Sequence, residues 1–301
     1  MNFMLLYRLA PAVVRRIALV FIAMTACCYG WAQSGAGNVC FHNEASDTLV
    51  VNDVLTRVLD AGLQSSGQRV AFVGKLFVDK PYVAHTLEGE EECLRVNVDE
   101  FDCTTFVETV LALAKTAGEG RASWRDFVYN LEQLRYRGGE LDGYGSRLHY
   151  ICDWILDNSY RGNVKDASDL FEDVAYAVKT VDYMTAHRKS YPALADSANY
   201  AAVKKVEEGF RNHRFGYLKT RSLGKKAVRN ALRDGDVLAF TSTLRDLDVT
   251  HLGIVVRGAD GEPHVLHASS SAGKVAVSDV PLVDFVKRNL GFTGVRVVRL
   301  R

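Results

Sequence analysis

The sequence changes its hydrophobic periodicity near Ala231, and this change is the strongest constraint on the fold. Before that point, apolar residues recur at spacings of three and four, which is typical of amphipathic helices. After it, short runs rich in Val, Leu and Ile alternate with turn residues, which is typical of an antiparallel sheet. Helices followed by strands predict an α+β fold.

The individual elements can be placed by residue number. Helices are predicted at 47–62, from about 65, and at 102–117, 123–134, 148–158, 182–187 and 282–289. Strands are predicted at 236–240, 251–256, 264–267, 275–277 and 295–300. The sequence has no internal repeat and no Ser- or Pro-rich linker. We therefore predict one domain, residues 33–301, with a helical insertion from about Arg121 to Ala227.

The first 32 residues have the features of an export signal. Three arginines and no acidic residue flank the apolar run IALVFIAMTA at 17–26. About ten apolar residues are too few to span a bilayer, which needs about 20. The small residues of Gly30-Trp31-Ala32 suit cleavage before Gln33, and we favour this interpretation.

Two other interpretations of the N-terminus stay open. Met24-Thr25-Ala26-Cys27 resembles a lipoprotein box, which would attach a lipid to Cys27 and the protein to a membrane. An uncleaved membrane anchor is the third. All three place the body outside the cytoplasm, in the periplasm or cell envelope.

The net charge bears on which molecules the protein can bind, and the cysteine content bears on its disulfides. Without the first 32 residues, the chain has 34 basic and 36 acidic residues, so we expect no nucleic acid partner. The body keeps Cys40, Cys93, Cys103 and Cys152, and an oxidising compartment permits disulfides. If Cys103 stays a free thiol, one pair at most can form, and we favour Cys40 with Cys93.

Cys103 is the candidate nucleophile. It stands in the segment FDCTTFVE, directly after Asp102, a good helix N-cap, and before an apolar stripe. The first turn of a helix carries unpaired N–H groups and the positive end of the dipole, which favour a thiolate. The alternative is a buried cysteine that only packs in the core.

A thiolate needs a base, and two histidines are candidates for supporting it. His251 begins the run HLGIVV, and His267 lies in HVLHASS. If Ala259-Asp260-Gly261 forms a three-residue hairpin loop, Gly253 lies opposite His267. The two histidines are then diagonal neighbours on one face, and His267 can orient His251. Structural histidines, or a Cys/His/His metal site, are the alternatives.

At this point the sequence resembles a known family, the N-acetylmuramoyl-L-alanine amidase-like branch of the NlpC-type, papain-like cell-wall cysteine hydrolases. The resemblance extends from about Val73 to Leu300. The segments that carry it are PYVAHTLE (81–88), FDCTTFVE (101–108), RYRGGELDGYGSRLHYICDWI (135–155), YMTAHRKSYPAL (183–194), GDVLAFTS (235–242), LDVTHLGIVV (247–256) and VLHASS (265–270).

The resemblance implies a papain-like fold in which the nucleophile helix packs on the sheet that carries the base. It assigns the nucleophile to Cys103, the general base to His251 and the orienting position to His267. It implies hydrolysis of the amide bond between the muramic acid lactyl group and L-alanine, without a metal or cofactor. The partners are then peptidoglycan fragments (muropeptides), and we expect a monomer.

Residues 144–150 are the predicted substrate wall. Tyr144, Ser146, Arg147 and Tyr150 offer hydroxyls, aromatic faces and a guanidinium for a stem-peptide carboxylate. Alternatively, Arg147 pairs with an acid such as Asp153 or Asp157. His149 and His187 are expected to be structural. The backbone N–H of Cys103 is expected to bind the oxyanion together with one further donor.

Three functional alternatives stay open. The same machinery serves a γ-D-glutamyl-diamino acid endopeptidase, in which a different bond is cut. A non-catalytic wall-binding protein with a decayed site is the second, and an acyltransferase on the same fold is the third. No separate wall-binding repeat is present and the insertion is large, so we expect a soluble muropeptide as substrate more than intact wall.

Overall fold

The computed structural model describes residues 39–301. The predictions of a signal peptide, of cleavage before Gln33 and of a lipid at Cys27 lie outside these residues. Within residues 39–301, no helix is both long enough and apolar enough to cross a membrane.

The N-terminal half is helical, as the periodicity predicts. Its main helices are α2 (Glu44–Asp60), α3 (Ser66–Leu76), α4 (Cys103–Gly118), α5 (Trp124–Arg135) and α6 (Ile151–Tyr160). Side chains of Asn43, Ser65, Asp102 and Ser123 cap α2 to α5 by accepting backbone N–H groups of the first turn. The predicted helix starts therefore follow from local capping chemistry.

The sheet has eight strands, and all of its pairings are antiparallel. Its order is β4-β5-β10-β6-β7-β8-β9, with β3 also paired to β10. The strands are β3 (Val164–Asp166), β4 (Val174–Lys179), β5 (His213–Lys219), β6 (Val237–Ser242), β7 (Val249–Arg257), β8 (Pro263–Ser269), β9 (Lys274–Val277) and β10 (Phe292–Leu300). The five predicted C-terminal strands are all confirmed, and so is the α+β class.

Short elements complete the chain. A separate two-stranded sheet joins β1 (Val39–Phe41) to β2 (Leu94–Val96). The remaining α-helices are α7 (Tyr183–Ala186), α8 (Ser197–Gly209), α9 (Thr220–Leu223), α10 (Lys226–Ala231) and α11 (Leu282–Arg288). Five 3₁₀ turns are η1 (Arg137–Gly139), η2 (Tyr144–Ser146), η3 (Ser168–Leu170), η4 (Arg188–Ser190) and η5 (Pro192–Ala195).

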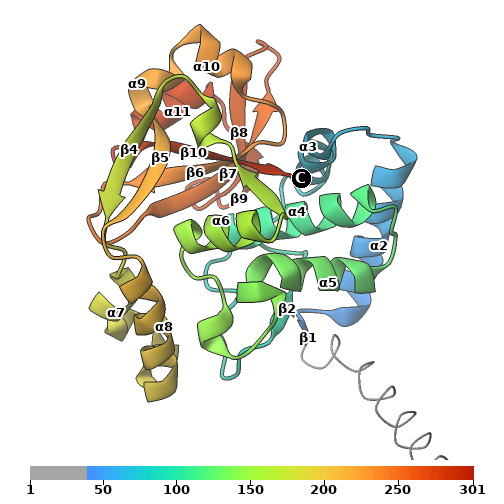
Figure 1. The fold of residues 1–301 in the computed structure, drawn as a ribbon. Helices are drawn as coiled ribbons and strands as arrows, with labels where there is room; N and C mark the ends of the chain where they lie inside the picture. The colour runs from blue at the N-terminus through green and yellow to red at the C-terminus, as the bar shows by residue number, and fades with distance from the viewer. Residues whose placement is uncertain (1–38) are drawn as a thin grey trace, which may run out of the picture. The chain divides into compact units, whose positions relative to one another are not determined.

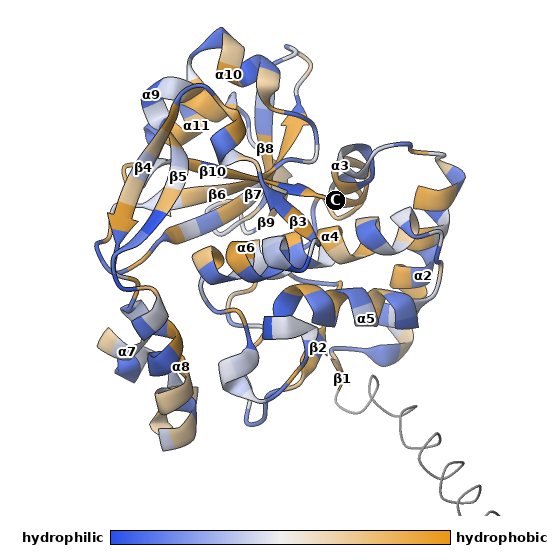
Figure 2. Ribbon diagram, viewed as in Figure 1, coloured by the Kyte–Doolittle hydropathy of each residue, from blue (hydrophilic) through white to orange (hydrophobic). Residues whose placement is uncertain are grey.

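The predicted helical insertion needs a correction. Besides its helices, the segment from Arg121 to Ala227 contributes β3, β4 and β5 to the main sheet. The outer strand β4 is only half-buried and leaves Tyr176 and Val178 exposed at the sheet edge, where Figure 2 shows apolar residues. Its register comes from β5, which is distant in sequence, so local periodicity gives a weak signal.

Helices cover both faces of the main sheet (Figure 1). On one face, α3 and α4 pack on β7, where Ile254 and Leu266 meet Phe106 of α4 around Gly74. On the other, α9 and α11 close a core that includes Val255 and Val265. Consecutive residues of β7 therefore point into different cores, which is why its fully buried stretch, residues 252–256, has no polar side chain.

A buried ion pair fixes α4 against α5. Glu108 of α4 accepts a 2.6 Å hydrogen bond from Arg135 Nε, and both side chains are almost fully buried. Arg135 Nη1 also donates to the carbonyl of Arg95, next to β2. The helix that begins with Cys103 is thus held to its neighbours by charge as well as by apolar packing.

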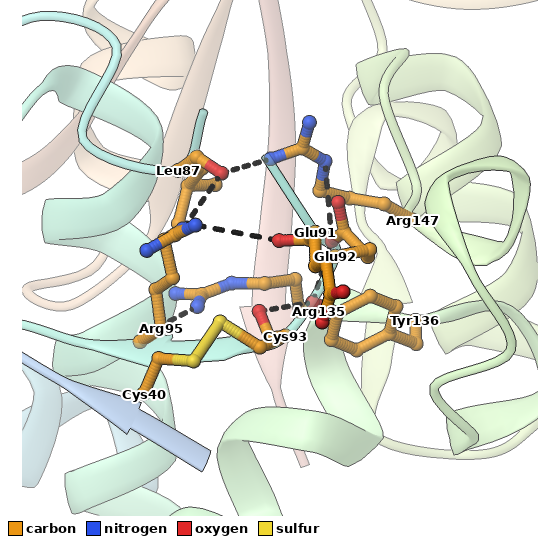
Figure 3. Close-up of a disulfide and its surroundings, with 9 residues drawn as sticks. All are labelled: Cys40, Leu87, Glu91, Glu92, Cys93, Arg95, Arg135, Tyr136 and Arg147. Carbon is orange, nitrogen blue, oxygen red and sulfur yellow. Dashed lines mark hydrogen bonds and ion pairs between the residues drawn. A yellow bond between two sulfur atoms is a disulfide. The ribbon is translucent and has the colours of Figure 1, made fainter. Parts of the chain in front are cut away.

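The predicted disulfide between Cys40 and Cys93 is confirmed (Figure 3). It joins β1 to the residue before β2 and closes a loop with a sequence separation of 53 residues. Cys103 and Cys152 are free among the described cysteines. Closing a loop of this length typically stabilises a fold by about 2–4 kcal/mol.

We predict that Glu108→Gln lowers the free energy of unfolding by about 3–5 kcal/mol, because Arg135 then stays buried without its counter-charge. Urea unfolding measures the loss. The matched control is Asp284→Asn, which removes an exposed pair with Lys287 and should cost at most about 1 kcal/mol. Equal losses in the two variants would contradict the anchoring role of Glu108.

Candidate active site

Cys103 lies in the first turn of α4, as predicted. The Asp102 Oδ1 atom accepts the N–H groups of Thr104 at 2.9 Å and Thr105 at 2.8 Å. The Thr105 hydroxyl accepts the N–H of Asp102 in return, which completes a capping box. Asp102 is therefore occupied as a cap, and Cys103 is left half-exposed at the helix start.

The β7–β8 hairpin has the predicted register. Arg257 pairs with Pro263 and Ile254 with Leu266, so Gly253 and His267 come next in line. Gly261 has a φ of 76°, the left-handed conformation that the loop requires. A Cβ on Gly253 would come within 2.6 Å of Val265 and 3.4 Å of the His267 Cβ. Glycine at 253 therefore provides the room that the histidine pair needs.

The two histidines contact each other directly. His251 Nε2 and His267 Nδ1 are 2.8 Å apart, with the rings nearly perpendicular at 86°. One of these two nitrogens must carry the proton, and the other must accept it. Because Nε2 of His251 contacts His267, Nδ1 is the ring nitrogen of His251 that can still exchange a proton with another group.

An aromatic wall holds both imidazoles, and periodicity alone did not single it out. Phe292 lies parallel to His251 with ring centroids 6.2 Å apart, and Phe240 lies 5.5 Å from the same ring. Phe285 meets His267 edge-to-face at 5.1 Å. Phe292 and Phe285 come from β10 and α11, so only the fold brings them to the histidines.

The strand alternation would place His251 on the face opposite α4, yet it lines a cavity together with Cys103. The register between β6 and β7 shifts beside it, from Phe240↔His251 to Thr241↔Val249, so Thr250 is an extra residue. Such bulges bend a strand and re-aim its side chains. The Cys103 sulfur also lies near the backbone N–H of Leu252, the residue after His251.

Two cavities meet at His251. The smaller, about 110 Å³, is lined by Cys103, Thr104, His149, Ile151, Leu247, Asp248, Val249, Thr250, His251 and Leu252. The larger, about 480 Å³, is lined by Ser242, Thr243, Leu244, Thr250, His251, His267, Ser269, Ser270, Ser271, Phe285, Asn289, Gly291 and Phe292. Thr250 and His251 belong to both linings. His251 thus borders both the small cavity that contains the thiol and the larger cavity.

Burial outweighs the helix dipole in setting the charge state of the site. It raises the pKa of Cys103 to about 11, with a smaller contribution from the Asp102 carboxylate. Burial lowers the pKa of His251 to about 3 and that of His267 to about 4, and His267 contributes to the shift of His251. At neutral pH without substrate, the site holds a neutral thiol and two neutral imidazoles. Burial therefore opposes the resting thiolate that the helix start favours, and the thiolate stays a prediction.

Asp248 and His149 line the thiol cavity, although the sequence patterns did not assign them to the site. Asp248 is fully buried, and its Oδ2 accepts the N–H of Cys152 at 2.5 Å. This carboxylate caps α6, because the N-cap residue Tyr150 provides no side-chain cap. His149 Nε2 contacts the carbonyl oxygen of Tyr144 at 2.8 Å, and burial lowers its pKa to about 3.

Tyr82 is a further residue beside the thiol. Burial raises its pKa, and the neighbouring charges of Cys103 and Asp102 add to the shift. Its backbone bridges to Phe101, just before the nucleophile helix. Tyr82 belongs to the segment PYVAHTLE (81–88), but no pattern in the sequence predicts that it lies close to Cys103.

Tyr144, Ser146, Arg147 and Tyr150 of the predicted substrate wall line neither cavity, although His149 of the same segment lines the smaller one. Arg147 is buried and donates to Glu88 Oε1 at 2.7 Å. It also donates to the carbonyl of Leu87 at 3.0 Å and lies 3.7 Å from Glu92 (Figure 3). It pairs with acids other than the expected Asp153 and Asp157. Its guanidinium is already occupied, which argues against its binding a substrate carboxylate.

The other members of that wall have structural contacts. The Tyr150 hydroxyl donates to Glu207 at 2.6 Å and accepts the N–H of Met184 at 2.7 Å. Ser146 Oγ donates to the carbonyl of Gly143 and accepts the N–H of Asp142. Tyr144 is buried between His149 and Arg147. Substrate binding by these residues stays a prediction, and their contacts favour support of the loop before α6.

No group of three or more His, Cys, Asp or Glu side chains among residues 39–301 is arranged to hold a metal ion.

A family model and several solved structures are similar to this chain. The family model described as N-acetylmuramoyl-L-alanine amidase-like matches residues 72–292. An N-acetylmuramoyl-L-alanine amidase from Bacteroides uniformis is 38% identical, with 78% of this chain and 99% of that chain covered and a TM-score of 0.73. A Bacteroides fragilis protein provisionally named a xylanase is also 38% identical, with 75% and 98% covered and a TM-score of 0.70.

A more distant structure shares the fold alone. A Legionella pneumophila protein of the family model DUF1460 is 20% identical, with 86% of this chain and 97% of that chain covered and a TM-score of 0.64. No curated protein matches the chain.

We predict that the alkylation rate of Cys103 rises about tenfold per pH unit from pH 6 to pH 9. The thiolate fraction of a group with a pKa of about 11 grows in this way with pH. Iodoacetamide labelling followed by mass spectrometry measures the rate. Cys152→Ser serves as the background, so that one described thiol remains.

A labelling rate that is flat above pH 6 would contradict this prediction, because it would reveal a resting thiolate–imidazolium pair. Cys103→Ser in the same background is the control for labelling elsewhere.

Proposed function

Because the chain belongs to the N-acetylmuramoyl-L-alanine amidase-like family, we propose that it is a cysteine-dependent amidase with a papain-like, NlpC-type arrangement of its site. The bond cut is the amide between the muramic acid lactyl group and L-alanine. The observation that carries the proposal is that Cys103 and His251 line one cavity while His267 occupies the far nitrogen of His251.

The proton is transferred in a defined order. His267, neutral because burial lowers its pKa, accepts the Nε2–H of His251 through Nδ1. This selects the tautomer of His251 whose Nδ1 has a free lone pair. Nδ1 takes the Cys103 proton as the sulfur attacks the lactyl carbonyl carbon. Because the resting thiol is neutral, proton transfer accompanies substrate attack.

The remaining steps return the enzyme to its starting state. The C–N bond breaks, and the proton on His251 Nδ1 moves to the leaving L-alanine amine. A thioester between Cys103 and the lactyl group remains. Water attacks it, His251 takes the water proton, the C–S bond breaks, and the thiol is restored. The products are a muramyl carboxylic acid and a peptide with a free N-terminal amine.

The oxyanion formed in both steps needs donors near the sulfur. The backbone N–H of Cys103, at the start of α4, is one. We assign the second to the Tyr82 hydroxyl, because its charge interacts with that of Cys103 and its raised pKa keeps the proton in place.

The thiol cavity favours the amidase over the γ-D-glutamyl endopeptidase. In the endopeptidase, the acyl half of the substrate carries an α-carboxylate, whereas a lactyl group is neutral. No lysine or arginine lines this cavity, His149 is neutral at pH 7, and Asp248 is a buried carboxylate. A carboxylate there would be desolvated without a counter-charge.

The same chemistry weighs against glycoside hydrolysis, the activity implied by the name of the Bacteroides fragilis protein. Glycosidases generally use two carboxyl groups that flank the scissile bond. Among the side chains that line the two cavities, Asp248 is the one carboxylate, and it caps α6. The pair of side chains best placed for chemistry is a thiol and an imidazole.

Export is part of the proposal. The Cys40–Cys93 disulfide supports it, since such bonds persist mainly in oxidising compartments. The substrate, peptidoglycan or its fragments, lies in the same place. We propose free secretion after cleavage before Gln33, with a lipid at Cys27 as the alternative.

We predict that the wild type releases intact stem peptide from defined muropeptides, as mass spectrometry of the products will show. Cys103→Ala should lower turnover by about 10⁶-fold and His251→Ala by nearly as much. His267→Ala should have about a hundredfold smaller effect, because its role is orientation. Circular dichroism controls for folding.

Release of a dipeptide that ends in D-glutamate would identify the endopeptidase instead. Full turnover by Cys103→Ala would exclude covalent catalysis at this sulfur.

We predict that the chain expressed from its own first residue in a Gram-negative host reaches the cell envelope with the Cys40–Cys93 bond formed. Fractionation and thiol labelling before and after reduction measure both. A lipid anchor would make the protein membrane-bound in the wild type and released in Cys27→Ser. Full-length, reduced protein in the cytoplasm would contradict export.

A further inference from the structure

The larger cavity has no role in the bond-breaking steps, yet it reaches the catalytic base. It measures about 480 Å³ and lies on the His267 side of His251, with Cys103 outside its lining. Such a cavity next to a base is expected to bind the part of the substrate that extends beyond the reacting bond.

The chemistry of the proposed function decides which part that is. His251 must protonate the departing nitrogen, so that nitrogen lies toward His251 when the acyl carbon is bonded to sulfur. The acyl half therefore occupies the small cavity around Cys103. The amine half continues past His251, in the direction of the larger cavity.

We propose that the larger cavity is the leaving-group subsite and binds the first two residues of the stem peptide, L-alanine and D-glutamate, through hydroxyl groups. This inference rests on the proposed function and adds the substrate class of one half of the site. The same subsite accepts D-glutamate with a free α-carboxylate and its α-carboxamide form nearly equally.

The lining explains this tolerance. No charged side chain lines the cavity, whereas hydroxyls come from Thr250, Ser269, Ser270 and Ser271. Ser269 Oγ accepts the N–H of Ala272 at 3.2 Å and lies 3.1 Å from Ser271 Oγ, which fixes the serine turn at the end of β8. A hydroxyl both donates and accepts, so it can bind either a carboxylate or an amide. A guanidinium would strongly prefer the carboxylate.

Apolar contacts are available for the aliphatic parts of the dipeptide. Phe285 and Phe292 form part of the wall, and the exposed Leu244 lies at its rim. Leu290, 90% exposed, stands between the lining residues Asn289 and Gly291. The Thr243 N–H donates to the carbonyl of Gly291 at 3.0 Å, which joins the two rim loops. A methyl group and two methylenes can pack against this surface.

The test compares three substrates: muramyl-L-alanine, muramyl-L-alanyl-D-glutamate and its α-carboxamide. We expect the dipeptide forms to exceed muramyl-L-alanine in kcat/KM by about tenfold, the equivalent of one or two hydrogen bonds. The two dipeptide forms should agree within about threefold. No advantage of the dipeptides, or a preference above about thirtyfold for the carboxylate, would overturn the proposal.

The matched variants are Ser270→Ala/Ser271→Ala, at two exposed positions of the turn, and Ser190→Ala, an exposed serine outside both cavities. The double variant should lose about tenfold in kcat/KM on the dipeptides through KM, and should lose less on muramyl-L-alanine, whose shorter leaving group makes fewer contacts in the subsite. Ser190→Ala should leave kcat/KM on every substrate unchanged. Ser270→Trp, which fills the cavity, should have a larger effect on KM. Wild-type KM in both turn variants would overturn the subsite.

Binding of the free dipeptide to the Cys103→Ala chain separates the two proposals. Calorimetry with L-alanyl-D-glutamate should detect binding that the serine double substitution weakens by about tenfold. No release of peptide from any substrate by the wild type would overturn the proposed function. Release together with dipeptide binding that is unaffected by the serine changes would overturn only the subsite.

Discussion

The contact between the first turn of α4 and strand β7 is the constraint on which the rest of the site depends. The Cys103 sulfur lies near the Leu252 N–H, so the proposed nucleophile is placed relative to the backbone that carries His251. Packing between α4 and the sheet sets this contact, and the buried Glu108–Arg135 pair fixes the helix from behind. Under the proposed mechanism, a small shift of α4 along its axis would move the thiol away from His251, and proximity is a large part of catalysis.

The partly or fully buried positions of Cys103, His251 and His267 have a chemical consequence. Water-poor surroundings disfavour the thiolate and both imidazolium ions, so all three groups are neutral before substrate binds. The mechanism proposed above needs a neutral His267, because only a neutral ring offers the Nδ1 lone pair to His251. The same burial that suppresses a resting thiolate therefore sets the tautomers for proton transfer.

Aromatic side chains pack around the two histidines, and His251 lies where two cavities meet. Phe240, Phe285 and Phe292 surround the rings and leave the edge of His251 open on both sides. The two cavities differ in chemistry: one contains the thiol and a buried carboxylate, and the other contains hydroxyls and no charge. In the proposed reaction, the acyl half of the substrate would enter the small cavity and the amine half the larger, hydroxyl-lined one.

The local sequence determined those helices, strands and turns that depend on interactions between residues close together in the chain. Capping residues such as Asp102, the apolar stripe of α4, the C-terminal strands and the Gly261 turn all follow from neighbours in the chain, and with them the Cys103, His251 and His267 candidates. Only the tertiary structure decided the strands of the insertion, the pairing of Arg147 with Glu88, the capping of α6 by Asp248 and the aromatic wall. Each of these joins distant segments, and charge states set by burial depend on the whole core, so no local pattern contains them.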